Sequence, residues 1–365
     1  MGNVLYIGMK VKDHGGYTVI HYRNIDLLSQ FFGEVSIVEL ESDVSGSIFS
    51  KLLNGWKGNY FRLTNAFIRN VLQKIETLNP QLVFFGNSLS TYLIIHIKRK
   101  YPNLPIISFF HNCEYSYFKE QYKAEKWSLL NLMHIIFAYR SERIAIKYSH
   151  YIWGLNKRDS DDLEQIYKRS LDLILATSFI DKAKQFLFHE PEECLNLLFV
   201  GSSLYANVQG IIYFVQNVMP FVKVKLYIVG NGLENYKDIL SVSNVSVVGR
   251  VEDLSLWYKK SDIVVSPIFF GSGMKTKTAE AMMYSKPIIA SEEAFKGYNI
   301  ESDRIGAVCN EAKEFIDAIN YFDRNRELLK DCALYSREMF VSFYTFEKSV
   351  RLVEHFFEKN RVYGS

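Results

Sequence analysis

The sequence predicts an α/β protein built from two Rossmann-like, doubly wound parallel sheets. Short apolar runs that end in Gly, Asn or Ser alternate with longer amphipathic segments from end to end, which is typical of a parallel sheet flanked by helices. The alternation breaks once, in the charged stretch Asp181–Glu193. The 365 residues exceed one ordinary core and suit two domains. We therefore expect domains at 1–180 and 181–344, and a closing helix at 345–365 that packs back on the first domain.

The strands are expected where the apolar runs are shortest and most continuous. In the first half they are Val4–Gly8, Val35–Leu40, Leu82–Gly86, Ile106–Phe110 and Tyr151–Gly154. In the second half they are Leu197–Gly201, Lys225–Gly230, Val245–Gly249, Ile263–Pro267 and Pro287–Ala290. Helices are expected between them, including one long helix around Tyr122–Tyr148 and a last one at Thr345–Arg361.

Composition excludes several classes of protein. With 48% hydrophobic residues, 7 Pro and 20 Gly, the chain is neither disordered nor collagen-like. Its 4 cysteines form no CxxC or Cys/His pattern, so reduced thiols in a cytosolic compartment are expected. The N-terminus does not resemble a signal peptide.

Charge is unevenly distributed. The formal net charge is only +3, but residues 51–158 carry 16 basic and 5 acidic side chains, or +11, which leaves −8 for the remainder. A near-neutral total without a nucleic-acid-binding module argues against nucleic acid as a partner.

Three glycine-containing turns could hold a phosphate where a strand leads into a helix. The first is Gly15-Gly16 and the second is Gly230-Asn-Gly232; either could equally be a plain turn. The third, Gly271-Ser-Gly-Met-Lys-Thr-Lys277, opens a helix with Lys275 and Lys277 in its first turn. Lysines there oppose the helix dipole, so an anion that binds both ammonium groups and the backbone amides would remove the conflict. The alternative is an ordinary surface pair of Lys277 and Glu280.

Five motifs of the second half occur in a recognisable order. They are Phe199-Val-Gly201, Leu226-Tyr-Ile-Val-Gly-Asn-Gly232, Val248-Gly-Arg-Val-Glu-Asp-Leu254, Ser261-Asp-Ile-Val-Val-Ser-Pro267 and Gly271-Ser-Gly-Met-Lys-Thr-Lys followed by Glu280-Ala-Met and Lys286-Pro287. This part resembles the donor-binding domain of family-four glycosyltransferases, also called glycosyl transferases group 1, which have the GT-B fold. The first half resembles the family more loosely. The resemblance implies a donor cleft between two facing domains, the first of which binds the acceptor.

The resemblance also implies roles for single residues. Glu280 would hold the ribose hydroxyls, and the amides of Gly273, Met274, Lys275 and Thr276 would cradle the diphosphate. Arg250 and Val251 would contact the base through their backbone. Gly15 and Gly16 would approach the donor phosphates, Gly232 would line the donor site, and His111 would lie near the transferred sugar. For His111 the alternative is a purely structural, hydrogen-bonded residue at a strand end.

Two departures from the family pattern matter. Ser272 stands where the family has its first glutamate, and Ser202 and Asn207 replace its usual Arg and Lys. We infer that Lys275 and Lys277 supply the missing positive charge at the leaving diphosphate. Because no metal-binding Asp-x-Asp motif is identified, we expect sugar transfer without a metal or other cofactor. The family usually retains the anomeric configuration, and the resemblance implies the same here.

The acceptor is expected to be a glycan or a lipid-linked saccharide, and the donor a UDP-, GDP- or dTDP-linked sugar. The stretch Lys51–Arg62 interleaves aromatic and basic residues, so it could lie on an anionic membrane or be a solvated loop. A cytoplasmic enzyme of bacterial surface polysaccharide or glycoconjugate synthesis, at the inner face of the plasma membrane, fits these expectations. Two alternatives stay open: a non-catalytic glycosyltransferase-like subunit, and a sugar-nucleotide epimerase on the same fold.

Overall fold

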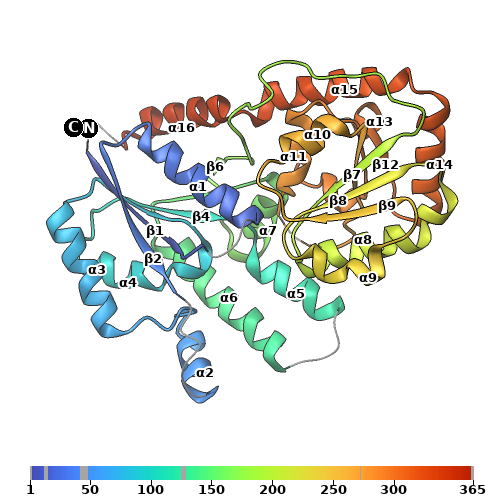
Figure 1. Ribbon diagram of the computed structural model, residues 1–365. Coiled ribbons are helices and arrows are strands. Elements are labelled where there is room, and N and C mark those ends of the chain that lie inside the picture. Colours follow the sequence, from blue (N-terminus) through green and yellow to red (C-terminus); the bar gives the residue numbers. More distant parts are fainter. Residues whose placement is uncertain (1, 12–14, 42–47, 125–128, 272, 363–365) are drawn as a thin grey trace. The chain divides into compact units, whose positions relative to one another are not determined.

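The computed structural model describes residues 2–11, 15–41, 48–124, 129–271 and 273–362. The described chain forms two compact units. The first comprises residues 1–13, 20–176 and 349–365, and the second comprises residues 14–19 and 177–348. Each unit contains one six-stranded sheet whose neighbouring strands are all parallel (Figure 1). The predicted architecture of two parallel sheets with flanking helices is confirmed.

The first unit has the strand order β2-β1-β3-β4-β5-β6. Its strands are β1 (Asn3–Met9), β2 (Glu34–Leu40), β3 (Leu82–Phe85), β4 (Ile106–Phe110), β5 (Tyr151–Gly154) and β6 (Leu173–Ile174). Its helices are most of α1 (Gly16–Ser29), α2 (Ile48–Trp56), α3 (Asn65–Leu78), η1 (Ser88–Ser90), α4 (Tyr92–Lys100), α5 (Glu114–Ala124), α6 (Leu129–Tyr148), α7 (Lys157–Tyr167) and most of α16 (Phe346–Asn360). Every residue of β3 and β4 is buried, as expected for strands covered by helices on both faces.

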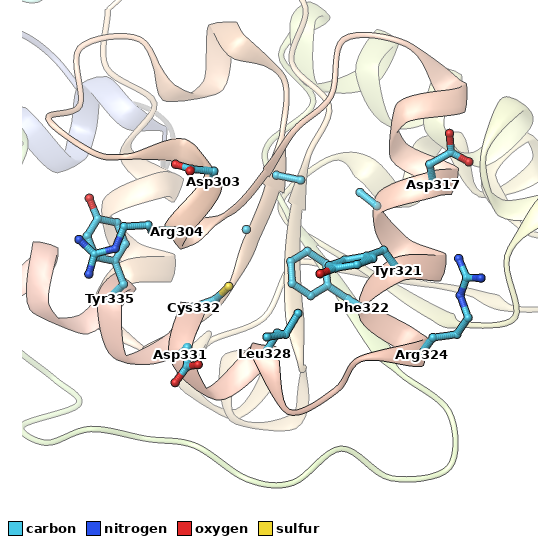
Figure 2. A pocket seen from close by; sticks show the side chains of 13 residues that line it. Asp303, Arg304, Asp317, Tyr321, Phe322, Arg324, Leu328, Asp331, Cys332 and Tyr335 are labelled. Carbon is cyan, nitrogen blue, oxygen red and sulfur yellow. The ribbon is translucent and has the colours of Figure 1, made fainter.

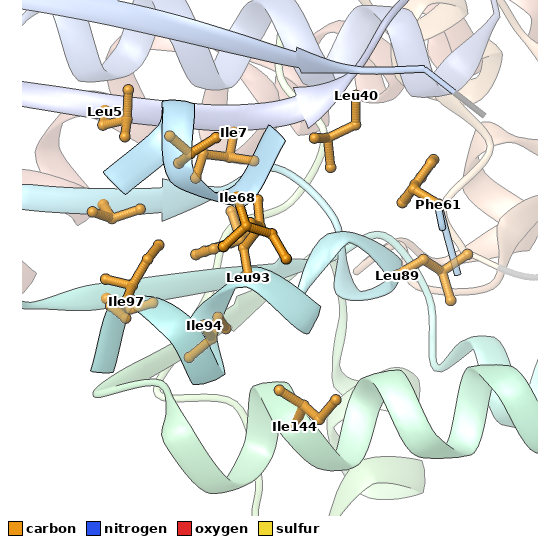
Figure 3. Close-up of a cluster of buried hydrophobic side chains, with 14 of the residues drawn as sticks. Leu5, Ile7, Leu40, Phe61, Ile68, Leu89, Leu93, Ile94, Ile97 and Ile144 are labelled. Carbon is orange, nitrogen blue, oxygen red and sulfur yellow. The ribbon is translucent and has the colours of Figure 1, made fainter. Parts of the chain in front are cut away.

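The core of the first unit lies between the sheet and the helices α3, α4 and α6 (Figure 3). Leu5 and Ile7 of β1 meet Ile68 of α3 and Ile94 of α4 there, and all four side chains are at most 5% exposed. On α16, the Phe357 ring lies 5.4 Å from Phe31 and 5.6 Å from Trp153. The closing helix is therefore part of the first unit's core.

The second unit has the order β12-β11-β10-β7-β8-β9. Its strands are β7 (Asn196–Val200), β8 (Lys225–Val229), β9 (Val245–Gly249), β10 (Ile263–Ser266), β11 (Ile288–Ala290) and β12 (Gly306–Val308). Its helices are α8 (Tyr205–Asn217), η2 (Met219–Phe221), η3 (Leu233–Tyr236), α9 (Lys237–Leu240), α10 (Ser255–Lys260), α11 (Thr276–Met283), α12 (Glu292–Phe295), α13 (Ser302–Ile305), α14 (Ala312–Arg324), α15 (Leu328–Met339) and the π-helix η4 (Phe340–Tyr344).

The structure corrects several expected elements. The single long helix around Tyr122–Tyr148 is two helices, α5 and α6. The stretch Lys51–Arg62 is partly helical, because its amphipathic beginning continues α2. The edge strands β6 and β12 were not predicted, since runs of two and three residues carry no periodic signal.

The boundaries between the units fall slightly away from the predicted ones. The charged stretch Asp181–Glu193 belongs wholly to the second unit. Arg337 of α15 holds its beginning through a hydrogen bond of 2.9 Å from Nη1 to Asp181 Oδ1, and His189 lies 3.0 Å from Asp262. The stretch is thus attached to one unit by two charged contacts.

Candidate functional site

The carboxyl ends of β7, β8 and β9 bring three glycine turns together in the second unit. Gly230, after β8, has φ +146°, and a Cβ there would lie 1.5 Å from the carbonyl oxygen of Gly201 after β7. Its N–H donates to the carbonyl of Gly249 at the end of β9, over 2.8 Å. Only glycine permits this close approach. Parallel strands place these turns on the edge where open α/β sheets bind ligands.

Gly232 also allows the turns after β7 and β8 to approach each other closely. It has φ +79°, and a Cβ there would lie 2.5 Å from Ser203 Oγ in the turn after β7. Arg250 and Val251 directly follow β9, so they leave the sheet at this same edge; Arg250 is exposed and Val251 is half-buried. The structure therefore places Gly232, Arg250 and Val251 at one edge of the sheet.

The loop between β10 and α11 follows, with two glycines in backbone conformations that favour glycine. Gly271 has φ +131° and Gly273 has φ +65°; Ser272 lies outside the described residues. Met274 is 6% exposed, so its side chain belongs to the core. Lys275 is the N-cap residue of α11, and its side chain makes no cap hydrogen bond.

The first turn of α11 is suited to an anion. It carries no acidic residue, and within the described residues the N–H groups of Thr276 and Lys277 have no hydrogen-bond acceptor, whereas those of Thr278 and Ala279 bond the Lys275 carbonyl and the Tyr298 hydroxyl. Such amides and the helix dipole together favour a negatively charged ligand. Gly16, at the start of α1, belongs to the second unit, as α11 does. A Cβ on Gly16 would be 3.4 Å from Thr276 Oγ1, whereas one on Gly15 would meet nothing within 4 Å.

The two lysines of this turn have different partners. Lys275 Nζ lies 2.8 Å from Glu293 Oε1 and donates to the Gly273 carbonyl over 3.1 Å. Glu293 also pairs with Lys296 at 3.0 Å. The charge of Lys275 is therefore already compensated by a carboxylate, which the sequence did not indicate.

Lys277 has no carboxylate partner among the described residues. Its Nζ donates to Asn207 Oδ1 of α8 over 2.6 Å and lies 4.8 Å from the centre of the Phe199 ring. Burial, and secondarily the charge of Lys275, lower the pKa of Lys277 to about 7. The expected alternative, a Lys277–Glu280 surface pair, is not formed. Asn207 of α8 is therefore the side chain that holds this lysine.

Glu280 lies on α11 beyond Lys277. Its Oε2 accepts a hydrogen bond of 3.1 Å from the hydroxyl of Tyr258, whose ring stacks on Tyr284 at 4.7 Å. Burial raises the pKa of Glu280. The Tyr258 contact leaves the other carboxylate oxygen to accept from a ligand hydroxyl. Tyr298 steadies the same turn, because its hydroxyl donates to the Lys275 carbonyl over 2.8 Å and accepts from the Ala279 N–H over 3.2 Å.

His111 belongs to the first unit, just after β4, and is 8% exposed. Its Nε2 lies 2.9 Å from the carbonyl oxygen of Gly86 after β3, so this nitrogen carries the proton and donates it to that bond. Burial lowers the pKa of His111 to about 3, and the ring is neutral at physiological pH. The bond joins the ends of two strands, which is the structural role that the sequence left open.

The described residues contain neither a candidate metal cluster nor a candidate membrane span. No group of three or more His, Cys, Asp or Glu side chains is arranged to hold a metal ion within them. No helix of the described chain is long and apolar enough to cross a membrane.

Comparison with known proteins extends these observations. Residues 195–324 match the family described as glycosyl transferases group 1. A protein of Klebsiella pneumoniae, described as an uncharacterized 44.6 kDa protein in the cps region, is 25% identical over 153 residues; the match covers 38% of this chain and only 39% of that relative.

Three solved structures are similar over nearly the whole chain. Sucrose-phosphate synthase from Thermosynechococcus elongatus has a TM-score of 0.74 at 12% identity and covers 98% of this chain and 99% of its own. HepE from Anabaena, in complex with UDP and glucose, has a TM-score of 0.69 at 13% identity, with 98% and 100% covered. WaaG, a glycosyltransferase involved in lipopolysaccharide biosynthesis, has a TM-score of 0.66 at 14% identity, with 96% and 99% covered. The chain thus has the GT-B fold, and its residues 195–324 match the family described as glycosyl transferases group 1.

Proposed function

We propose that this glycosyltransferase transfers a sugar from a nucleotide-sugar donor to a glycan or lipid-linked saccharide, with retention at the anomeric carbon and without a metal ion. One observation carries the proposal. The α11 turn combines uncapped backbone amides with Lys277, a half-buried lysine whose described partners are an amide oxygen and an aromatic face. A nucleoside diphosphate would supply the negative charge that this turn lacks.

The departing diphosphate is the chemical problem that the turn would solve. When the bond to the anomeric carbon breaks, negative charge grows on the phosphates and positive charge on the sugar. Fixed amides from Gly273 to Thr276 and the ammonium of Lys277 would stabilise the growing negative charge without having to reorganise. Glu280 would meanwhile accept hydrogen bonds from the ribose hydroxyls with the carboxylate oxygen that Tyr258 does not use. Positioning and electrostatics, rather than covalent catalysis, would supply the rate.

The lysines would not contribute equally. Lys275 is bound to Glu293, so its net effect on a bound anion would be small. Lys277 would carry most of the cationic contribution that the family pattern obtains from the residues replaced by Ser202 and Asn207. His111, neutral and bonded to Gly86, would act through its position beside the sugar and not by transferring protons.

The donor base and the acceptor are proposed on other grounds. HepE structures hold UDP and UDP-glucose, so we infer a UDP-sugar ahead of GDP- or dTDP-sugars. The Klebsiella pneumoniae relative is described as a protein in the cps region, and WaaG as a glycosyltransferase involved in lipopolysaccharide biosynthesis, which supports a surface polysaccharide or glycolipid as the acceptor. The enzyme would then work on the cytoplasmic side of the plasma membrane.

One surface of the first unit supports attachment to the membrane. On α2, the four large side chains Phe49, Leu52, Leu53 and Trp56 recur at helical spacing and are 76%, 39%, 47% and 57% exposed. Arg140 lies 4.4 Å from the centre of the Trp56 ring. An apolar helix face beside cations suits the interface of an anionic bilayer.

The test is titration calorimetry of the full-length protein with UDP, GDP and dTDP, followed by incubation with the matching nucleotide sugars. Binding of one nucleotide and slow hydrolysis of its sugar conjugate are expected. Nucleotide binding without turnover under any acceptor condition would favour the non-catalytic subunit. No binding of any nucleotide would refute the proposed function.

A further inference from the structure

A cavity of about 710 Å³ lies in the second unit, outside the α11 turn (Figure 2). It is bounded by α13, by the edge strand β12, by the second half of α14 and by the first half of α15. Gly306 and Ala307, which line it, are the first residues of β12. The glycine turns around α11 instead follow the carboxyl ends of the strands. The amino ends and the carboxyl ends of parallel strands lie on opposite sides of a sheet, so the cavity is separate from the proposed donor site.

The floor of the cavity is apolar and aromatic. Phe322 and Cys332 are 5% and 7% exposed, and Leu328 lies beside them. Tyr321 is 50% exposed, and its ring lies 5.6 Å from that of Phe322 at an angle of 74°. A pyranose ring has a face of C–H groups and a rim of hydroxyls, so an exposed aromatic ring provides a platform for its apolar face.

The rim of the cavity is rich in hydrogen-bond acceptors. Asp303, Asp317 and Asp331 are exposed, and none of them forms a hydrogen bond or an ion pair within the described chain. Ionised carboxylates only accept hydrogen bonds, and each offers two oxygens to neighbouring hydroxyls.

The two arginines of the rim, Arg304 and Arg324, already have partners within the protein. Arg304 Nη1 lies 3.3 Å from Glu301 Oε1, and its guanidinium stacks 4.1 Å above the centre of the Tyr335 ring. Arg324 Nε donates to the Asn320 carbonyl over 3.0 Å. Arg324 has no carboxylate partner among the described residues, but the three carboxylates outnumber it, so the rim remains negative and disfavours a phosphate and hence a nucleotide. A neutral, hydroxyl-rich ligand fits both the floor and the rim.

We propose that this cavity is a second binding site of the protein and that it holds a segment of a neutral oligosaccharide. Tyr321 stacks on a sugar ring, and Asp331 with its neighbours accepts from the sugar hydroxyls. This inference rests on the proposed function, in which the protein handles glycans. A chain held here has a higher effective concentration at the enzyme than a free chain, so the site favours long acceptors over short ones.

The test uses the full-length protein and three trisaccharide probes: maltotriose, cellotriose and chitotriose. Saturation-transfer NMR is expected to show contact with at least one of them. Tyr321→Ala and Asp331→Asn are each expected to weaken that binding about tenfold or more. Both side chains are exposed, so the melting temperature should not change. Phe221→Ala, which removes a 66% exposed aromatic of the same unit, and Asp238→Asn, on exposed α9, are the matched controls.

Three results would overturn the inference: no contact with any probe, binding that is unaltered in Tyr321→Ala, or binding that UDP displaces competitively. Calorimetry with UDP separates this failure from failure of the proposed function. If UDP binds and its sugar is turned over while the trisaccharides do not bind, only the cavity site is lost. If Tyr321-dependent glycan binding persists without nucleotide binding, the cavity site stands and the proposed function is refuted.

Discussion

Replacing Lys277 by methionine would remove the ammonium group at the α11 turn and keep an unbranched chain of similar length. Within the described residues the ammonium has one hydrogen bond, to Asn207, and it lies over the Phe199 ring. A hydrogen bond to a charged group contributes about 1.5–3 kcal/mol, and every 1.4 kcal/mol is tenfold in affinity. We therefore expect Lys277→Met to weaken UDP binding by about 10- to 100-fold.

Protonation of Lys277 when a diphosphate binds gives a second and more specific test of its role. Because burial lowers the pKa of Lys277 to about 7, the free protein carries a neutral amine well above that pH. A bound diphosphate favours the protonated form and raises the pKa again, so binding at about pH 8.5 should take up about one proton. Calorimetry in two buffers of different ionisation enthalpy measures this uptake, which Lys277→Met should abolish.

The matched control is Lys275→Met. Glu293 keeps Lys296 as a partner at 3.0 Å after this substitution, so the fold should survive. Proton uptake should persist, and the loss of affinity should be smaller than with Lys277→Met. Equal losses in the two variants, or identical binding heats in both buffers for the unaltered protein, would refute the reasoning.

Three further predictions concern stability and membrane binding. In the first unit, Glu142 accepts hydrogen bonds from the N–H groups of Glu114 and Tyr115 at 2.6 and 3.3 Å and from the Tyr167 hydroxyl at 2.7 Å. Glu142→Ala would orphan these donors and should cost about 2–4 kcal/mol in denaturant unfolding, whereas Glu120→Ala on the exposed face of α5 should cost little. Burial raises the pKa of Glu142 to about 8, so the folded state binds more protons than the unfolded chain between the ordinary value of 4.5 and about 8. Thermal stability should therefore fall as the pH rises through that range, and Glu142→Gln should flatten the profile; an unchanged slope would contradict it. Gly230→Ala should destabilise by more than about 2 kcal/mol, because its Cβ would lie 1.5 Å from a backbone oxygen, while Gly15→Ala should leave the melting temperature unchanged. Finally, Phe49→Ser with Trp56→Ser should abolish salt-sensitive flotation with phosphatidylglycerol vesicles, and Phe221→Ser should not; vesicles that never bind the unaltered protein would remove the membrane proposal.

Much of the fold could be predicted because parallel strands buried on both faces must be almost wholly apolar. The runs of β3, β4 and β7 are buried throughout, and each stood out in the sequence. The existence of two separate helices, α5 and α6, and the short strand β12 could not be predicted, since neither leaves a periodic signal. The glycines and first-turn lysines of the α11 turn, on which the proposed phosphate binding rests, could be read from the sequence because they are local features.

What the sequence determined by itself is therefore local: the alternation of elements, the glycine turns and the order of the motifs. Tertiary structure decided which of the two lysines is paired with a carboxylate and which remains available to a ligand. Lys275 and Lys277 are two residues apart and look equivalent in the sequence, but one meets Glu293 and the other meets Asn207, 70 residues away. Partners that far along the chain come together only when β7, β10 and their helices pack. The same holds for the cavity beside β12, whose floor and rim come from four separate elements.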